Sequence, residues 1–222
     1  MINPKTITET IGTALLVFII QVAVGSGSDL APLAIGGILI AGVFAGGPIS
    51  GAHYNPAVSL SIALRGNMTY DEMVPYIIAQ VVGGGLGGVC GGIVCGNFAT
   101  VSMGEGATLL QALLAEVIVT FALCFVVLSV ATNPKADGNH YYGLAIGLVV
   151  VSGAVGVGGI SGGAFNPAVA VGLSIAGAFS NFFYCLMVSA ANLVGGAAAA
   201  GCYLACVPEL SGTVGESTPL NA

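Results

Sequence analysis

Two copies of one polar nonapeptide interrupt a mostly apolar chain, SGAHYNPAV at residues 50–58 and SGGAFNPAV at residues 161–169. Asn55 and Asn166, 111 residues apart, open the two Asn-Pro-Ala triplets. Asparagine is a favoured N-cap and proline is favoured at the first helical position, so each triplet predicts a helix start. A capping asparagine uses its side-chain oxygen on its own helix, which leaves its NH₂ group available as a donor. The triplets comprise Asn55, Pro56, Ala57, Asn166, Pro167 and Ala168.

The other residues that could do chemistry are two carboxylates and a histidine. Glu9 and Glu116 lie within apolar stretches, and a carboxylate inside a membrane is costly and marks a functional position. We favour a bracing role, in which each accepts hydrogen bonds from the loop backbone of its own half; ion coupling is the alternative. His53, beside the first triplet, is interpreted as a packing and hydrogen-bonding residue rather than a ligand. His140 lies in a polar loop, and we assign it no role.

No group of nucleophile, base and orienting residue is visible in the sequence, so we predict neither an enzyme nor a cofactor. The six cysteines lie in apolar runs, and we interpret them as small buried hydrophobic residues rather than as disulfides or metal ligands. They are Cys90, Cys95, Cys124, Cys185, Cys202 and Cys206.

Composition indicates the lipid bilayer as the medium. Hydrophobic residues make up 56% of the chain and charged residues 5%, against about a quarter charged in soluble domains. The three basic residues, Lys5, Arg65 and Lys135, and a net charge of −6 exclude nucleic-acid binding.

Six stretches are long enough to cross a bilayer, which takes about 20 apolar residues in a helix. The predicted spans are 7–25, 31–49, 73–96, 108–131, 141–160 and 181–207. The segments that follow Asn55 and Asn166 hold about ten residues, which makes helices of about 15 Å, half of the roughly 30 Å hydrocarbon core. We predict irregular backbone in the preceding stretches GGPISGAH and GVGGISGGA, which must be buried in protein or line water.

Glu9 and Glu116 recur at nearly the same sequence separation as Asn55 and Asn166, which indicates an internal repeat. We therefore predict one transmembrane domain over residues 1–222, with two repeats at approximately 6–96 and 107–207. Each repeat has three spans, and three is odd, so the second repeat enters the membrane from the opposite side. The expected fold is all-α, with six transmembrane helices and two re-entrant half-helices inverted around a central pore. We expect residues 208–222 to be a polar tail.

The basic residues suggest an orientation. Lys5, Arg65 and Lys135 all fall on the side of the two termini in this topology. The positive-inside rule then predicts that both termini are cytoplasmic, and we expect the cell membrane to be the location.

The stretches SGAHYNPAV, GGAFNPAV, ETIGTALLVF and AEVIVTFALCF resemble the aquaporin (major intrinsic protein) family. The resemblance implies tetramers with one pore per subunit, and passive, cofactor-free conduction of water or small neutral solutes. It also implies that Asn55 and Asn166 are the pore asparagines, and that Glu9 and Glu116 brace the loops.

The chain departs from the family at the selectivity filter. Counted from the triplets, the four filter positions fall on Ile35, Ala154, Gly163 and Val169. The family usually has an arginine where Val169 stands. We therefore predict a wide, apolar, arginine-less filter that passes small neutral solutes such as glycerol, hydrogen peroxide, urea or ammonia besides water.

Two other classes of function remain open at this stage. Inverted repeats, broken helices and intramembrane acids also occur in ion-coupled secondary transporters. A membrane scaffold or adhesion protein could also use a poorly conducting fold of the same kind.

Overall fold

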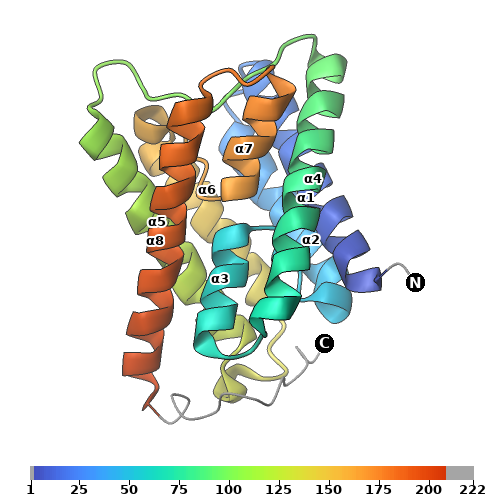
Figure 1. Cartoon of the computed structure of the whole chain (residues 1–222), viewed down its shortest axis with the longest axis vertical. Coiled ribbons are helices and arrows are strands. Elements are labelled where there is room, and N and C mark those ends of the chain that lie inside the picture. The colour runs from blue at the N-terminus through green and yellow to red at the C-terminus, as the bar shows by residue number, and fades with distance from the viewer. Residues whose placement is uncertain (1–2, 209–222) are drawn as a thin grey trace.

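The structure, a computed structural model, describes residues 3–208, which fold into helices joined by loops (Figure 1). The long helices are α1 (Pro4–Gly25), α2 (Ala31–Ser50), α4 (Tyr70–Cys95), α5 (Leu109–Ala131), α6 (Tyr142–Ser161) and α8 (Phe182–Cys206). Two ten-residue helices, α3 (Pro56–Arg65) and α7 (Pro167–Ala176), follow the two triplets. A 3-10 turn, η1 (Pro134–Ala136), precedes α6. Of the predicted tail at 208–222, only Pro208 lies within the described residues.

Local capping explains why two helices begin about three residues before their predicted starts. α1 begins three residues before the predicted start, because the side chain of Asn3 accepts a hydrogen bond from the backbone N–H of Lys5 and Pro4 follows at the first helical position. α4 also begins early, because Thr69 and Glu72 form a reciprocal capping box around its first turn.

The glycine-rich stretches before the triplets are mostly helical, which corrects the prediction of irregular backbone there. α2 continues to Ser50 and α6 to Ser161. Both helices end at a glycine in the left-handed region, Gly51 with φ 86° and Gly162 with φ 88°. Helix satisfies backbone groups that lipid cannot, so only residues 51–54 and 162–165 remain irregular.

The two halves pack in the same way. α1 packs on α4 as α5 packs on α8, and α4 contacts α7 as α8 contacts α3. The short helices lie at opposite ends of the molecule, with α3 in the lower half of Figure 1 and α7 in the upper half. The predicted fold class, six transmembrane helices and two half-helices in an inverted repeat, is confirmed.

Glycine makes the close contacts of the half-helices possible. A Cβ atom on Gly84 of α4 would lie 2.4 Å from the carbonyl oxygen of Ala168, at the start of α7. In the other half, a Cβ atom on Gly196 of α8 would lie 2.7 Å from the carbonyl oxygen of Ala57, at the start of α3. Both approaches are closer than any other residue type allows, so these glycines fix the depth of each half-helix.

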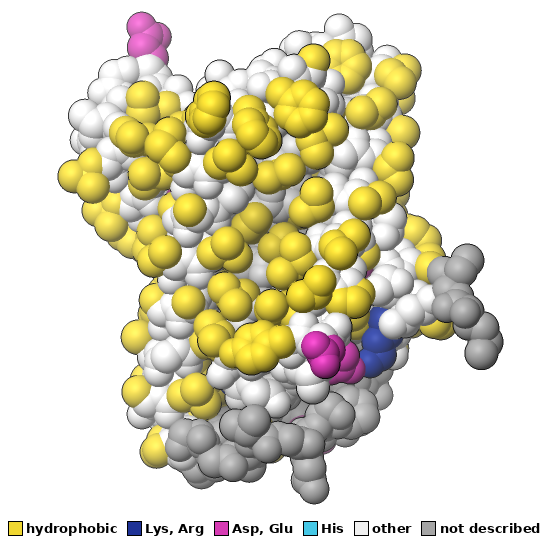
Figure 2. Space-filling view, in the orientation of Figure 1, with side chains coloured by type: hydrophobic (Ala, Val, Ile, Leu, Met, Phe, Trp, Pro, Cys, Tyr) yellow, Lys and Arg dark blue, Asp and Glu magenta, His cyan; other side chains and the backbone are white. Residues whose placement is uncertain are grey.

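The outer surface suits lipid. The six long helices are long and apolar enough to cross a membrane, and hydrophobic side chains cover most of the face in Figure 2, with charged groups near its upper and lower margins. Large apolar side chains point outward, such as Leu110 and Phe183, which are 76% and 79% exposed. The structure corrects one interpretation here: only Cys124 and Cys185 are buried, whereas Cys90, Cys202 and Cys206 are exposed on the outer surface.

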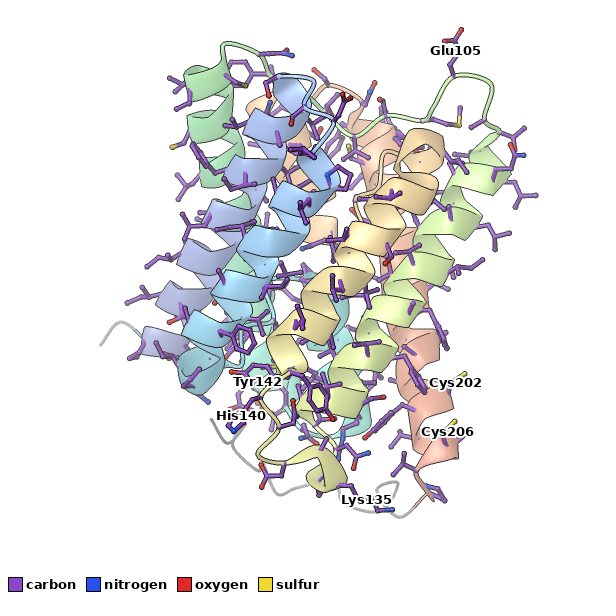
Figure 3. All side chains as sticks on the ribbon, turned by 180° about the vertical axis from the view of Figure 1, so that it is seen from behind. Glu105, Lys135, His140, Tyr142, Cys202 and Cys206 are labelled. Atoms are coloured by element: carbon purple, nitrogen blue, oxygen red, sulfur yellow. The ribbon has the colours of Figure 1, made fainter. Side chains whose placement is uncertain are left out.

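The molecule has two distinct ends, which we name after residues labelled in Figure 3. The Glu105 end carries the loop between α4 and α5, and the Lys135 end carries the loop between α5 and α6. α1 begins and α8 finishes at the Lys135 end (Figure 1).

Candidate functional site

The two triplets meet at the centre of the molecule and bond to one another. Asn55 and Asn166 are the N-caps of α3 and α7, and each side-chain oxygen accepts the backbone N–H two residues on, at 2.9 Å in both halves. The donors are Ala57 and Ala168. Pro56 and Pro167 occupy the first helical positions.

The amide nitrogens of these asparagines cross to the other half. Nδ2 of Asn55 donates to the carbonyl oxygen of Phe165 at 2.9 Å, and Nδ2 of Asn166 donates to that of Tyr54 at 2.8 Å. An amide NH₂ carries two hydrogens, so each asparagine keeps one N–H beyond this bond. The site can therefore offer a passing molecule two donors at one level.

The loops that lead into the half-helices have an unusual backbone. Tyr54 and Phe165 are left-handed, with φ of 49° and 50°. At the matched positions two residues earlier, Ala52 has φ 49° and Gly163 has φ 64°. A left-handed residue other than glycine costs roughly 1–2 kcal/mol, so each loop needs partners that hold this conformation.

In the second half Glu116 supplies these partners. Its Oε1 accepts hydrogen bonds from the Ser161 hydroxyl (2.7 Å) and the Ala164 backbone N–H (3.0 Å). Its Oε2 accepts from the Phe165 backbone N–H (2.8 Å) and the Asn192 amide (2.7 Å). Glu116 is fully buried, and bonds to a charged acceptor contribute about 1.5–3 kcal/mol each, which exceeds the backbone strain.

Glu9 has a matching environment in the first half. Its Oε1 accepts from the Ser50 hydroxyl (2.7 Å) and the His53 backbone N–H (3.0 Å), and its Oε2 accepts from the Tyr54 backbone N–H (2.7 Å) and the Gln80 amide (2.9 Å). The two carboxylates therefore hold the two loops by the same four kinds of donor.

His53 departs from this symmetry. Its backbone N–H is bound by Glu9, and its ring Nδ1 lies 3.0 Å from the Ser59 hydroxyl. The ring also packs on Tyr76, with the centroids 5.1 Å apart.

Sequence reasoning missed several members of this framework. Ser50 and Ser161 each bind a carboxylate, and the hydroxyls of Tyr76 and Tyr184 donate to the carbonyl oxygens of those same serines, at 2.8 and 2.7 Å. The signal was present, because the serines recur at the spacing of the triplets. A polar residue that recurs at the repeat offset was the clue.

A cavity of about 600 Å³ passes between the two half-helices. Its lining extends from Thr100, in the loop at the Glu105 end, past Asn55 and Asn166 to Asn139, in the loop at the Lys135 end. Most of the wall is apolar, and the loops 51–54 and 162–165 both border it. The apolar part of the wall includes Leu39, Val43, Val58, Ile62, Val127, Ile146, Val150 and Leu173.

All four positions counted as the filter line this cavity. Ile35 lies on α2, Ala154 on α6, Gly163 in the second loop and Val169 in the first turn of α7. None of these side chains carries a charge or a hydrogen-bond donor. α7 runs from the centre toward the Glu105 end (Figure 1), so these residues belong to that half of the cavity.

The family profile described as Major intrinsic protein matches residues 2–203. The chain belongs to this family. The family predicted from the sequence is thus confirmed.

Curated relatives support the same assignment. Aquaporin NIP2-1 of Oryza sativa subsp. japonica is 35% identical over 190 residues, which cover 78% of this chain and 60% of the relative. Aquaporin TIP4-1 of Zea mays is 32% identical over 186 residues, which cover 77% of this chain and 73% of the relative. The chain thus matches less than two thirds of the length of the rice protein.

A solved structure supports the fold. The aquaglyceroporin from Plasmodium falciparum superimposes with a TM-score of 0.79 at 23% identity, over 94% of this chain and 98% of that one. At this identity the likeness is a likeness of fold.

Proposed function

We propose that this chain is a passive transmembrane channel for water and small neutral solutes, without enzymatic activity or a cofactor. The observation that carries the proposal is the cavity of about 600 Å³, which lies within one chain and reaches both of its ends. Family membership and the names of the relatives, aquaporins and an aquaglyceroporin, support it. We also propose a homotetramer with one such pore in each subunit.

The centre of the pore favours neutral solutes over cations. α3 and α7 both begin there, and a helix N-terminus has a partial positive charge of roughly half an elementary charge. Asn55 and Asn166 present one remaining N–H each, and a solute oxygen can accept these donors as it passes. A cation meets two positive helix ends and donors it cannot use.

The filter we propose, Ile35, Ala154, Gly163 and Val169, should select weakly. A solute that passes an apolar ring loses hydrogen bonds to water, at roughly 1–3 kcal/mol for each group left without a replacement. Water makes few favourable contacts that would offset this loss, whereas glycerol or hydrogen peroxide can also contact the apolar wall. We therefore propose that the pore conducts such solutes well relative to water, with urea and ammonia as further candidates.

The described contacts disfavour both alternatives. An ion-coupled transporter needs a carboxylate that can release its partners, yet Glu9 and Glu116 each accept four hydrogen bonds from the protein, which fills their usual capacity. A scaffold or adhesion protein needs no pore, and it would not require two pore-facing asparagines cross-bonded at the centre of a cavity.

For orientation, we propose that the Lys135 end faces the cytoplasm, in the cell membrane. Lys5 lies in the first turn of α1, Arg65 is the last residue of α3 and Lys135 lies in η1. All three basic residues therefore belong to this end. The positive-inside rule supports the assignment.

Flux into liposomes tests the proposed function. Stopped-flow measurements on vesicles with the purified chain should show water and glycerol permeabilities above those of protein-free vesicles. Val169→Arg should reduce glycerol flux and proton leak more than water flux, because arginine narrows the ring and repels cations. Val169→Leu is the matched control, since it narrows the ring without adding charge and should leave the proton leak unchanged.

Two results would contradict the proposal. Vesicles no more permeable than protein-free ones would refute a channel. A wild-type channel that passes water alone, and whose arginine variant alters only water flux, would refute the weakly selective filter.

A further inference from the structure

Arg65 is the one basic residue, of the three in the chain, that lines the cavity. It is the last residue of α3 and is only 6% exposed. Its neighbours on the cavity wall are Ile62, one turn earlier on the same helix, and the loop at the Lys135 end. Lys5 and Lys135, by contrast, are exposed and are not part of the wall.

The guanidinium of Arg65 is held by helix ends rather than by a carboxylate. Its Nη2 donates to the carbonyl oxygen of Thr132 at 3.2 Å, and Thr132 is the C-cap of α5. Arg65 is also in the last turn of its own helix. The carbonyl ends of two helices therefore stabilise the positive charge, in the way that cations are favoured at helix C-termini.

Among the residues that the structure describes, this charge has no opposite charge as a partner. Within residues 3–208 no carboxylate forms an ion pair with Arg65, and its Nε is buried without a hydrogen-bond partner. Asp137 lines the same mouth of the cavity but is exposed to solvent. A buried charge without an opposite charge is costly, and its field is screened less than that of a surface residue.

We propose that Arg65 is the cation-excluding residue of this pore, placed at the Lys135 end, opposite to the uncharged filter. The inference rests on the proposed channel function and assigns a specificity-determining role within it. A neutral solute passes a fixed positive charge without penalty and can accept a hydrogen bond from the guanidinium. A hydronium or sodium ion is repelled by this charge. The repulsion is stronger than in bulk water, because the apolar wall of the cavity has a low dielectric constant.

A purely structural role makes a different prediction. If Arg65 only anchors the loop after α5 through Thr132, the geometry of its guanidinium would matter and its charge would not, so glutamine and lysine would disturb the channel equally. Arg65→Gln keeps an amide donor, on a shorter side chain, but removes the charge. Arg65→Lys keeps the charge but has a different donor geometry. The two variants therefore separate charge from anchoring.

The test measures proton and sodium permeability of reconstituted vesicles, with a pH-sensitive dye inside and glycerol flux recorded on the same preparation. Arg65→Gln should raise the cation permeability by about tenfold, the effect of losing roughly 1.4 kcal/mol of repulsion. Arg65→Lys should stay near the wild type. Lys5→Gln, the same loss of charge outside the cavity, should change nothing.

A second variant distinguishes lost repulsion from a damaged channel. Arg65→Gln combined with Val169→Arg should return the cation leak to the wild-type level or below, because the charge is restored at the other end of the pore. A leak caused by misfolding would persist. If the glutamine variant does not reconstitute, Arg65→Met, which keeps a flexible apolar stem but removes the charge, carries the same expectation.

Wild-type leak in Arg65→Gln vesicles that still conduct glycerol would overturn this inference and leave the channel function intact. An equal leak in the lysine and glutamine variants would also overturn it, since anchoring would then be the cause. The wild-type glycerol flux reports on the proposed function separately.

Discussion

Replacing Glu116 by glutamine tests the bracing role of the buried carboxylates. Glutamine has nearly the same shape but only one acceptor oxygen, so its NH₂ must face two of the four donors. The Ser161 hydroxyl can turn to accept, and so can the Asn192 amide, whose Oδ1 has no hydrogen-bond partner among the described residues. A backbone N–H cannot turn. Either Ala164 or Phe165 therefore points its N–H at another donor, whichever way the new amide lies.

The magnitude follows from these contacts. One buried backbone donor without an acceptor costs about 1–3 kcal/mol, and three bonds that change from a charged to a neutral acceptor lose about 1 kcal/mol each. Removing a charge from the membrane interior is favourable and offsets about 2.5–3.5 kcal/mol of this cost. The net loss of stability is about 0.5–3.5 kcal/mol, and a chain of this length changes its Tm by about 2–4 °C for each kcal/mol.

Thermal unfolding of the detergent-solubilised protein measures this shift, alongside glycerol flux in vesicles. Glu116→Gln should lower both the Tm and the flux, because loop 162–165 loses its fixed carbonyls. Glu105→Gln, at an exposed carboxylate in the loop labelled in Figure 3, is the control and should change neither. A wild-type Tm in the Glu116 variant would refute the bracing role. The role would also be refuted if flux through the wild type depended on pH or on an ion and Glu116→Gln removed that dependence, because this would indicate ion coupling.

Two further predictions concern packing and topology. Gly196→Ala should lower the Tm, because its Cβ atom would lie 2.7 Å from the Ala57 carbonyl oxygen. Gly201→Ala, on the same helix, is the control and should leave the Tm unchanged, because its Cβ atom would meet no atom within 4 Å. Equal Tm values for the two variants would refute the close-packing argument. In a cysteine-light variant, Ser28→Cys and Ala136→Cys should react with an impermeant thiol reagent from opposite sides of the membrane, and labelling from one side would contradict the inverted topology.

The sequence was most informative where one physical requirement dominates. Helix number follows from the length of apolar runs, and the starts of α3 and α7 follow from the capping chemistry of Asn55 and Asn166. The bond from Asn55 to the Phe165 carbonyl could not be predicted, because it depends on how closely the two halves approach. Hydropathy also failed for Cys202, since an apolar residue is equally suited to lipid and to the protein interior.

The crossed asparagine bonds have a consequence for biogenesis. Each half of the chain supplies the carbonyl that the other half's asparagine requires, Phe165 for Asn55 and Tyr54 for Asn166. When the first half enters the membrane during synthesis, its Tyr54 carbonyl and Asn55 amide have no partner until the second loop arrives. A buried polar group in that state is costly, so we expect these groups to stay in contact with water until the two halves meet. The crossed bonds can form only once both loops are in place.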